Sequence, residues 1–385
     1  MSNKFRGMGW QHERCMAPLY ASIADFRTQH DDFDVEWESR SLADFGDGNL
    51  ETLIDDFDLI VFDHPFVGQA ESEKLFLNLS ELLSPVELHL FEADSLGPCW
   101  KSYWTDGGLW ALPIDAAAQV ATYIPDMLTR YRDDPPETLS DVFSLAHEAR
   151  EDGLFIALPC VPIDAICLFF TLTAGRNEPI PAEPTGFPSK GTVIEVLDVM
   201  RELIAIAHPQ SLQWNPIMCF DHMSSHKDVV YQPYAFGYSN YARPGAKHVL
   251  HFANIPAIGD LKHAGSILGG AGIGITRSCK NVDTALEYIK YLCHPEYQSR
   301  GYFRSGGQPA SRTAWLSEEA NRASTDFFSG TFQTLENSYL RPTFDGIIPW
   351  FRDAGILLHN YLSEQLSQAE CARRLREGFL SAGKT

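Results

Sequence analysis

Several planar polar and aromatic side chains in this sequence could bind a small molecule that carries many hydroxyl groups. Aromatic rings stack on the apolar faces of such a molecule, and carboxylate, amide and imidazole groups hydrogen-bond to its hydroxyls. The aromatic candidates are Trp10, Tyr238 and Tyr241. The hydrogen-bonding candidates are His12, Asp63, His64, Asp115, Gln119, Asn240 and Gln308. For each aromatic ring, packing in the hydrophobic core is the alternative.

Asp115 is the most informative of these residues, because the segment 109–126 around it consists mainly of small and apolar residues. A carboxylate in apolar surroundings is costly unless a partner compensates it, and no neighbour in sequence can do so. We therefore expect Asp115 to contact ligand directly, and Asp115→Asn to weaken binding while leaving the fold intact. The alternative is a core aspartate that pairs with a distant arginine or backbone N–H.

Three arginines could extend the ligand class to acids, because a guanidinium holds a carboxylate with two parallel hydrogen bonds. They are Arg14, Arg243 and Arg341. If two of them converge, the ligand is an acidic sugar or a small organic acid. A surface ion pair is the alternative for each arginine.

Metal and nucleophile chemistry have weaker signals. His222 and His226 have the i, i+4 spacing of a metal-binding pair on a helix, but the Glu of an HExxH motif is missing. We predict no metal site and no other cofactor. Cys160 is the best candidate nucleophile, with His12 or His64 as its base, but a buried inert thiol is the alternative. We predict no catalytic residue.

The glycine-rich segment 268–275 does not have the pattern of a phosphate-binding loop. It lacks GxGxxG spacing, and neither Lys-Ser nor Lys-Thr follows it. We expect Gly269 and Gly270 to let a strand pack closely and to bring backbone N–H groups near a ligand.

Strands and helices that alternate along the chain must position these residues. The runs 5–10 and 57–62 predict strands, and the second is apolar apart from Asp58, which is typical of a parallel strand buried on both faces. In open α/β sheets, ligands bind beyond the carboxyl ends of the strands. The candidates at such ends are Trp10, His12, Asp63 and His64.

Two segments, 109–126 and 254–259, predict crossings between two lobes that are built from interleaved pieces of chain. A chain of 385 residues is too long for one ordinary core and suits two lobes of about 150 to 200 residues. We place the hinges at Leu112–Ala117 and Ile255–Gly259, and expect the lobes to close on a small ligand.

Composition excludes several classes of partner. The formal net charge of −21 argues against nucleic acid and anionic membrane surfaces, both of which need clustered Lys and Arg. No apolar run is long enough to span a membrane. The eight cysteines show no CxxC spacing and resemble small buried hydrophobes, which mildly favours a reducing compartment. The first residues lack the pattern of a secretory signal, so we expect either a cytoplasmic protein or a signal absent from this sequence.

Six segments along the chain together resemble the bacterial extracellular solute-binding proteins, family 1, which are the sugar-type receptors of ABC importers. The segments are GMGWQHERC near the start, DLIVFDHPFVGQA (58–70), GGLWALPIDAAAQVATYIPD (107–126), LGGAGIGITRSCKNVDTALEYIKYL (268–292), GGQPASRTAW (306–315) and LENSYLRP (335–342). The order and spacing of these segments, more than any one of them, carry the resemblance.

The resemblance implies a two-lobed α/β fold of the periplasmic-binding-protein type II, with a mixed sheet flanked by helices in each lobe and the ligand in the cleft between them. Lobe 1 would comprise 1–113 and 264–314, and lobe 2 would comprise 114–263 and 315–385.

The implied function is capture of a carbohydrate or sugar-like acid for an ABC importer by a monomeric periplasmic receptor that would contact the importer's membrane subunits. A cytoplasmic enzyme or sensor on the same fold is the alternative. Thiaminase I resembles this fold and carries a nucleophilic cysteine in its first crossing segment, but 115–119 contains none.

Overall fold

A computed structural model describes residues 4–245, 247–260 and 262–383, apart from the side chain of Asp47. The first three residues, on which the expectation about a secretory signal partly rests, lie outside this description. The chain forms two compact units, each assembled from three segments. Unit 1 runs to Ala116 and includes Gly269–Ala320 and Thr343–Asp345. Unit 2 contains Ala117–Leu268, Asn321–Pro342 and the chain from Gly346 onward.

The chain passes between the units at several points in the sequence. The divisions follow Ala116, Leu268, Ala320, Pro342 and Asp345. The boundaries predicted from the sequence fall after residues 113, 263 and 314. The proposed hinge Leu112–Ala117 contains the first division. The second proposed hinge, Ile255–Gly259, lies wholly inside unit 2, and the chain instead leaves that unit after Leu268.

The sheet of unit 1 mixes parallel and antiparallel pairing. Strand β1 (Lys4–Trp10) lies between β2 (Asp34–Arg40) and β3 (Leu59–Phe62) and is parallel to both. Strand β10 (Leu268–Ile275) pairs with β3 in the antiparallel direction, with Gly272 opposite Phe62. All four residues of β3 are buried, as expected of a central strand covered on both faces.

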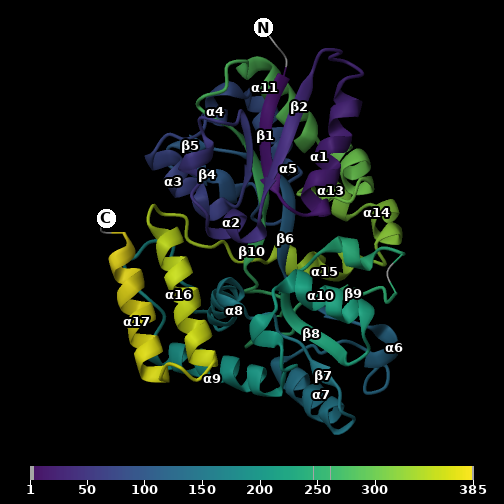
Figure 1. The fold of residues 1–385 in the computed structure, drawn as a ribbon, viewed down its shortest axis with the longest axis vertical. Coiled ribbons are helices and arrows are strands. Elements are labelled where there is room, and N and C mark those ends of the chain that lie inside the picture. The colour runs from purple at the N-terminus through teal and green to yellow at the C-terminus, as the bar shows by residue number, and fades with distance from the viewer. Residues whose placement is uncertain (1–3, 246, 261, 384–385) are drawn as a thin grey trace. The chain divides into compact units, whose positions relative to one another are not determined.

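Helices and short strands complete unit 1 (Figure 1). The helices are α1 (Glu13–Phe26), α2 (Leu42–Asp47), α3 (Val67–Ser72), α4 (Leu79–Leu82), α5 (Pro85–Ala93), α11 (Val282–Cys293), α12 (Pro295–Tyr297) and α13 (Arg312–Trp315). A two-stranded ribbon joins β4 (Trp104–Thr105) to β5 (Gly108–Leu109). Helix α14 (Glu318–Ala323) carries the chain across the third division.

Strand β6 (Leu112–Tyr123) begins in unit 1 and continues into unit 2, where it has antiparallel partners. It pairs there with β8 (Val229–Phe236) and with β9 (His251–Ala253). A register shift between Val120 and Thr122 interrupts the pairing with β8. The short strand β7 (Phe155–Ile156) is parallel to β8. The sheet of unit 2 is therefore also mixed, which confirms the predicted α/β class.

Helices form the rest of unit 2, and most of them are long (Figure 1). They are α6 (Pro125–Leu128), α7 (Leu139–Glu151), α8 (Pro162–Ala174), α9 (Lys190–Ile206), α10 (Pro216–Ser225), α15 (Phe327–Glu336), α16 (Ile347–Leu362) and α17 (Gln368–Ala382). Helices α8 and α16 approach closely because Gly355 has no side chain, and a Cβ there would lie 2.4 Å from the Pro162 carbonyl oxygen.

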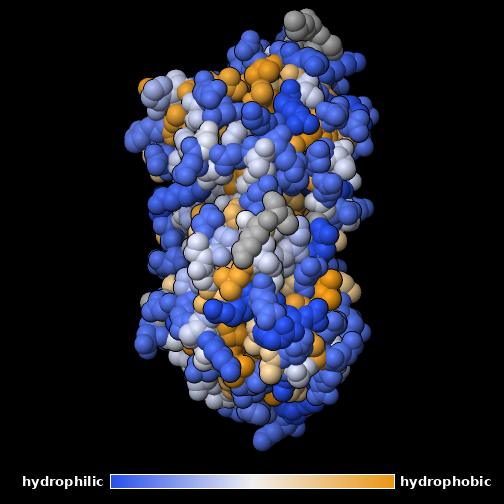
Figure 2. Space-filling model, turned by 90° about the vertical axis from the view of Figure 1, so that its left-hand side faces the viewer, coloured by the Kyte–Doolittle hydropathy of each residue, from blue (hydrophilic) through white to orange (hydrophobic). Residues whose placement is uncertain are grey.

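The face shown in Figure 2 is mostly hydrophilic, with hydrophobic residues in separate groups. Among the described residues, no helix combines the length and the apolar character that crossing a bilayer requires.

Candidate ligand-binding site

Polar and aromatic residues gather at one edge of the unit 1 sheet. Trp10 ends β1, Arg40 ends β2, and the two residues are opposite each other in register. Asp63 follows directly after β3, which is also parallel to β1. The carboxyl ends of parallel strands meet at a common edge, where α/β proteins bind their ligands. The structure therefore brings together two residues predicted from the sequence, Trp10 and Asp63, and one that was missed, Arg40.

The side chains of Trp10 and Arg40 bring buried hydrogen-bond donors to this edge. The Trp10 ring packs on Phe45 with 4.8 Å between the ring centroids, and the Arg40 guanidinium lies 5.5 Å from the same Phe45 ring. Trp10 Nε1 and the Arg40 Nε and Nη2 atoms are buried, and none of them has a hydrogen-bond partner among the described residues. A buried donor without an acceptor costs about 1 to 3 kcal/mol, so these groups favour a partner that supplies oxygen atoms.

Burial is the largest influence on the pKa of Arg40 at this edge. Burial lowers the pKa of Arg40 to about 10, while the nearby carboxylates of Asp44 and Asp63 oppose that shift. Asp63 Oδ1 accepts a hydrogen bond of 2.8 Å from the backbone N–H of His64 and lies 3.1 Å from His64 Nδ1. Both Asp63 and His64 are buried. The carboxylate is therefore oriented by the residue that follows it.

Asp115 has a partner that the sequence analysis did not assign. Arg14 Nε donates a hydrogen bond of 2.8 Å to Asp115 Oδ2, and Arg14 Nη2 donates to Asp115 Oδ1. The two side chains are almost fully buried, with 4% and 0% of their surfaces exposed. Asp115 therefore has the distant arginine partner that was the alternative to direct ligand contact, and the surface ion pair considered for Arg14 is wrong, because this pair is buried. Burial raises the pKa of Asp115, and the adjacent Arg14 opposes that rise.

Two other candidates in unit 1 stabilise its backbone. His12 caps α1, because its Nδ1 atom accepts a hydrogen bond of 3.0 Å from the backbone N–H of Arg14. Burial, assisted by the positive charge of Arg14, lowers the pKa of His12 to about 4, so its ring is neutral at pH 7. Gln308 Nε2 donates to the Ala116 carbonyl oxygen at 2.7 Å, and the Ala116 N–H donates to the Gln308 carbonyl oxygen at 3.1 Å. Gln308 thus fixes β6 just before the chain leaves unit 1.

Gly270 is required by close packing of strands, as the sequence analysis expected of the glycine-rich segment. Its φ is +106°, and a Cβ at this position would lie 2.2 Å from the Asp115 carbonyl oxygen. Gly269 precedes it in β10.

We expect Gly270→Ala to lower the free energy of unfolding by about 2 to 3 kcal/mol, because the new methyl group adds overpacking to an unfavourable backbone conformation. Gly153→Ala is the control, since Gly153 has a φ of +74° and nothing within 4 Å of an added Cβ. That variant should lose only about 1 kcal/mol. Urea unfolding of both variants measures the difference, and equal losses would show that backbone conformation alone explains the need for glycine.

Comparison with solved structures identifies the architecture. The T. maritima MalE3 protein with bound maltose is 16% identical, with 98% of each chain covered and a TM-score of 0.81. The GacH receptor of Streptomyces glaucescens, solved without ligand and with acarbose, is 14% identical over 100% of this chain and 99% of that one, with a TM-score of 0.81. An ABC transporter solute-binding protein from Thermotoga lettingae, bound to α-D-tagatose, is 16% identical over 98% and 99%, with a TM-score of 0.80. The chain has the fold of these solute-binding proteins. Neither a model of a protein family nor a curated protein matches its sequence.

The candidates in unit 2 of this solute-binding fold have mixed roles. Gln119 is buried in β6, where its Oε1 atom accepts a hydrogen bond of 2.6 Å from Thr171. The Tyr241 hydroxyl donates to Asp221 Oδ1 at 2.7 Å, which anchors its ring beside α10. Arg341 is buried, with its guanidinium 5.8 Å from the Phe351 ring, so a surface ion pair does not describe it.

The other unit 2 candidates follow β8. Tyr238 is buried and immediately precedes a short 3₁₀ helix (Ser239–Ala242) that contains Asn240. Arg243 ends that helix and is half-buried. Arg14 is committed to Asp115 in unit 1. Of the three arginines predicted from the sequence, Arg243 and Arg341 are therefore the pair that could converge on a ligand.

Cys160 is unsuited to nucleophilic chemistry. The residue is fully buried, and burial raises the pKa of its thiol, which keeps the thiol protonated. A catalytic cysteine instead needs an accessible thiolate. The alternative of a buried inert thiol therefore describes Cys160.

Proposed function

We propose that this chain is a solute-binding protein that captures a small carbohydrate or sugar-like acid for an ABC importer. The supporting observation is the likeness of its fold, over nearly the whole length of each chain, to proteins solved with maltose, acarbose and tagatose. Fold alone does not determine function, so the chemistry of the site must agree with the proposal.

The edge formed by Trp10, Arg40 and Asp63 has suitable chemistry. An indole N–H and a guanidinium donate hydrogen bonds, while a carboxylate accepts them, and sugar hydroxyls can do both. Arg40 can in addition hold a carboxylate with two parallel bonds, which favours a sugar acid over a neutral sugar. In this proposal the other predicted residues help to orient the ligand. Asp115 does so indirectly, through its pair with Arg14.

A thermal-melt panel of neutral sugars, sugar acids and polyols tests the proposal. A ligand at about one hundred times its Kd should stabilise the protein by about 2.7 kcal/mol, seen as a rise in Tm. Arg40→Met should abolish the rise caused by sugar acids, because it removes the charged donors. Arg130→Met, at an exposed position, is the matched control and should leave the rise unchanged. A panel in which no compound raises the Tm would contradict sugar capture.

We propose that the protein acts as a periplasmic monomer and meets the membrane subunits of the importer. A cytoplasmic sensor or enzyme on the same fold is the second candidate. It is favoured by one observation, that all eight cysteines are buried, as small hydrophobic residues are. Fractionation of cells that express the complete native gene distinguishes the two, since recovery with cytoplasmic markers would contradict delivery to an importer.

A further inference from the structure

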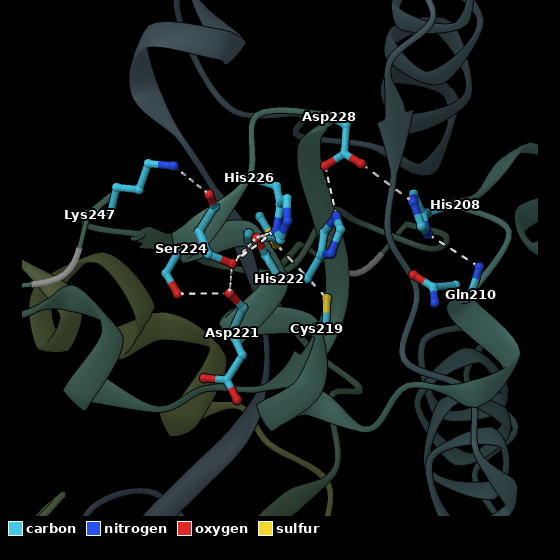
Figure 3. Close-up of polar contacts among 11 residues, drawn as sticks. His208, Gln210, Cys219, Asp221, His222, Ser224, His226, Asp228 and Lys247 are labelled. Carbon is cyan, nitrogen blue, oxygen red and sulfur yellow. Dashed lines mark hydrogen bonds and ion pairs between the residues drawn. The ribbon is translucent and has the colours of Figure 1, made fainter.

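A cluster of two histidines and an aspartate lies in unit 2, and none of its residues belongs to the candidate site of unit 1. His208 follows α9, His222 lies in the last turn of α10, and Asp228 immediately precedes β8 (Figure 3). The i, i+4 pattern in the sequence had drawn attention to His222 and His226. The structure instead brings His222 together with His208 and Asp228. Neither of these two residues lies in α10 with His222.

The side chains of this cluster converge on one small region. His222 Nε2 lies 2.8 Å from Asp228 Oδ1, and His208 Nε2 lies 3.5 Å from Asp228 Oδ2. The three potential ligand atoms all lie within 4.8 Å of one another. The side chains of His208, His222 and Asp228 are 11%, 16% and 38% exposed, so the cluster is sheltered but accessible from solvent.

Packing and backbone hydrogen bonds hold the cluster in place. The Trp214 ring stacks on His208, with 4.5 Å between the centroids and 10° between the planes, and its centroid lies 4.7 Å from that of His222. Backbone bonds of 2.8 Å connect His208 N–H to the Ile156 carbonyl oxygen and Phe155 N–H to the Asp228 carbonyl oxygen. Both bonds tie the cluster to β7, so its geometry belongs to the sheet of unit 2.

We propose that His208, His222 and Asp228 bind one divalent transition-metal ion of the Zn²⁺ type. Two imidazole nitrogens and one carboxylate oxygen form a ligand set that Zn²⁺ accepts, with water in the remaining position of a tetrahedron. Such ligands bind the ion at about 2.0 to 2.2 Å, so the spacing of the donor atoms must adjust slightly when the ion binds. Ca²⁺ and Mg²⁺ prefer all-oxygen sites and are disfavoured here.

Metal binding also requires a change of tautomer at His208. The backbone N–H of Gln210 donates to His208 Nδ1 at 3.2 Å, which places the proton of the neutral ring on Nε2 (Figure 3). When Nε2 binds a metal ion, that proton must move to Nδ1, and the Gln210 N–H must find another acceptor. Gln210 is exposed, so water can replace the long hydrogen bond.

His226 provides a matched control within the same region. It follows the end of α10, and its ring stacks on His222 with 4.3 Å between the centroids. Its Nδ1 atom lies 2.9 Å from Ser225 Oγ and 3.2 Å from the His222 carbonyl oxygen. In this proposal His226 is not a metal ligand, although it is as close in sequence to the cluster as any other histidine.

Isothermal titration of chelator-treated protein with Zn²⁺ tests the site. We expect one ion per chain with a micromolar or lower Kd, and no binding of Mg²⁺. His222→Gln and Asp228→Asn should each weaken Zn²⁺ binding at least tenfold, and circular dichroism should show that both variants remain folded. His226→Gln should change the Kd by less than twofold. Failure to bind Zn²⁺ stoichiometrically, or equal loss in all three variants, would overturn the assignment.

A spectroscopic measurement checks the location independently. Cu²⁺ bound at the cluster should quench the fluorescence of Trp214, because its ring stacks on a ligating histidine. Trp214→Phe should remove the quenched component while the protein still binds the ion. Quenching that persists in Trp214→Phe at the same ion concentration would place the ion elsewhere.

Discussion

Asp115→Asn should lower the free energy of unfolding by about 3 to 5 kcal/mol, because it leaves the buried guanidinium of Arg14 without its counter-ion. Arginine stays protonated in proteins, so Arg14 cannot relieve the cost by losing its charge. The pair is almost fully inaccessible to solvent, and water cannot replace the missing carboxylate. Urea unfolding monitored by circular dichroism measures the loss. This expectation replaces the one from sequence, in which Asp115→Asn weakened ligand binding and spared the fold.

A double variant separates the buried charge from simple loss of packing. Arg14→Met alone and Asp115→Leu alone should also be strongly destabilising, since each leaves one charge of the buried pair without its partner. The combination of Arg14→Met with Asp115→Leu should be less destabilised than either single variant, because apolar residues of similar volume often replace a buried ion pair at little cost. If the effects of the two substitutions simply add, the ion pair is not the source of the loss.

Asp164→Asn should stabilise the protein in a way that depends strongly on pH. Asp164 lies buried in the first turn of α8, and no described residue hydrogen-bonds to its Oδ2 atom. Burial raises the pKa of Asp164 from 3.8 to about 8. Between those two values the folded protein keeps a proton that the unfolded chain releases. Stability therefore falls by about 1.4 kcal/mol for each unit that the pH rises through this window.

Asparagine is neutral at every pH and escapes this loss. The gain in unfolding free energy from Asp164→Asn should be near zero at pH 4 and on the order of 3 to 5 kcal/mol at pH 8. Denaturant unfolding at both values measures it, with Asp133→Asn at an exposed position as the control. A gain of the same size at both values would mean that folding leaves the pKa of Asp164 unchanged, so that its carboxyl group is ionised in the folded protein as it is in the unfolded chain.

The fold could be predicted because its signals are local and occur in a recognisable order. The apolar run 57–62 predicted a buried central strand, and β3 occupies Leu59–Phe62 with all residues buried. The segment 109–126 predicted a long strand that passes between units, and β6 with the division after Ala116 agrees with that pattern. The segment 254–259 has a similar composition but stays within unit 2, because small and apolar residues also suit an ordinary buried loop.

The candidate site was harder to predict because its partners are distant in the sequence. Arg14 and Asp115 are 101 residues apart, and no pattern near Asp115 reveals the arginine that neutralises it. Arg40 had a usable signal, since it ends β2, which pairs with the strand that ends in Trp10, and Asp63 follows the strand on the other side of β1. That signal was hidden because Arg40 stands among charged residues, at the end of a strand that alternates acids with apolar residues. The histidine cluster likewise depends on Asp228 and His208, which come from two separate turns of the chain.

The antiparallel pairing of β3 with β10 affects how the chain can fold while it is being synthesised. Residues 59–62 leave the ribosome more than two hundred residues before their partner 272–275 is made. Unit 1 therefore cannot complete its sheet during most of translation, and an apolar strand keeps an open edge in the meantime. Such edges pair readily with other chains, and contacts so distant in sequence form slowly. A nascent chain arrested after Ala116 should accordingly depend on chaperones to avoid aggregation.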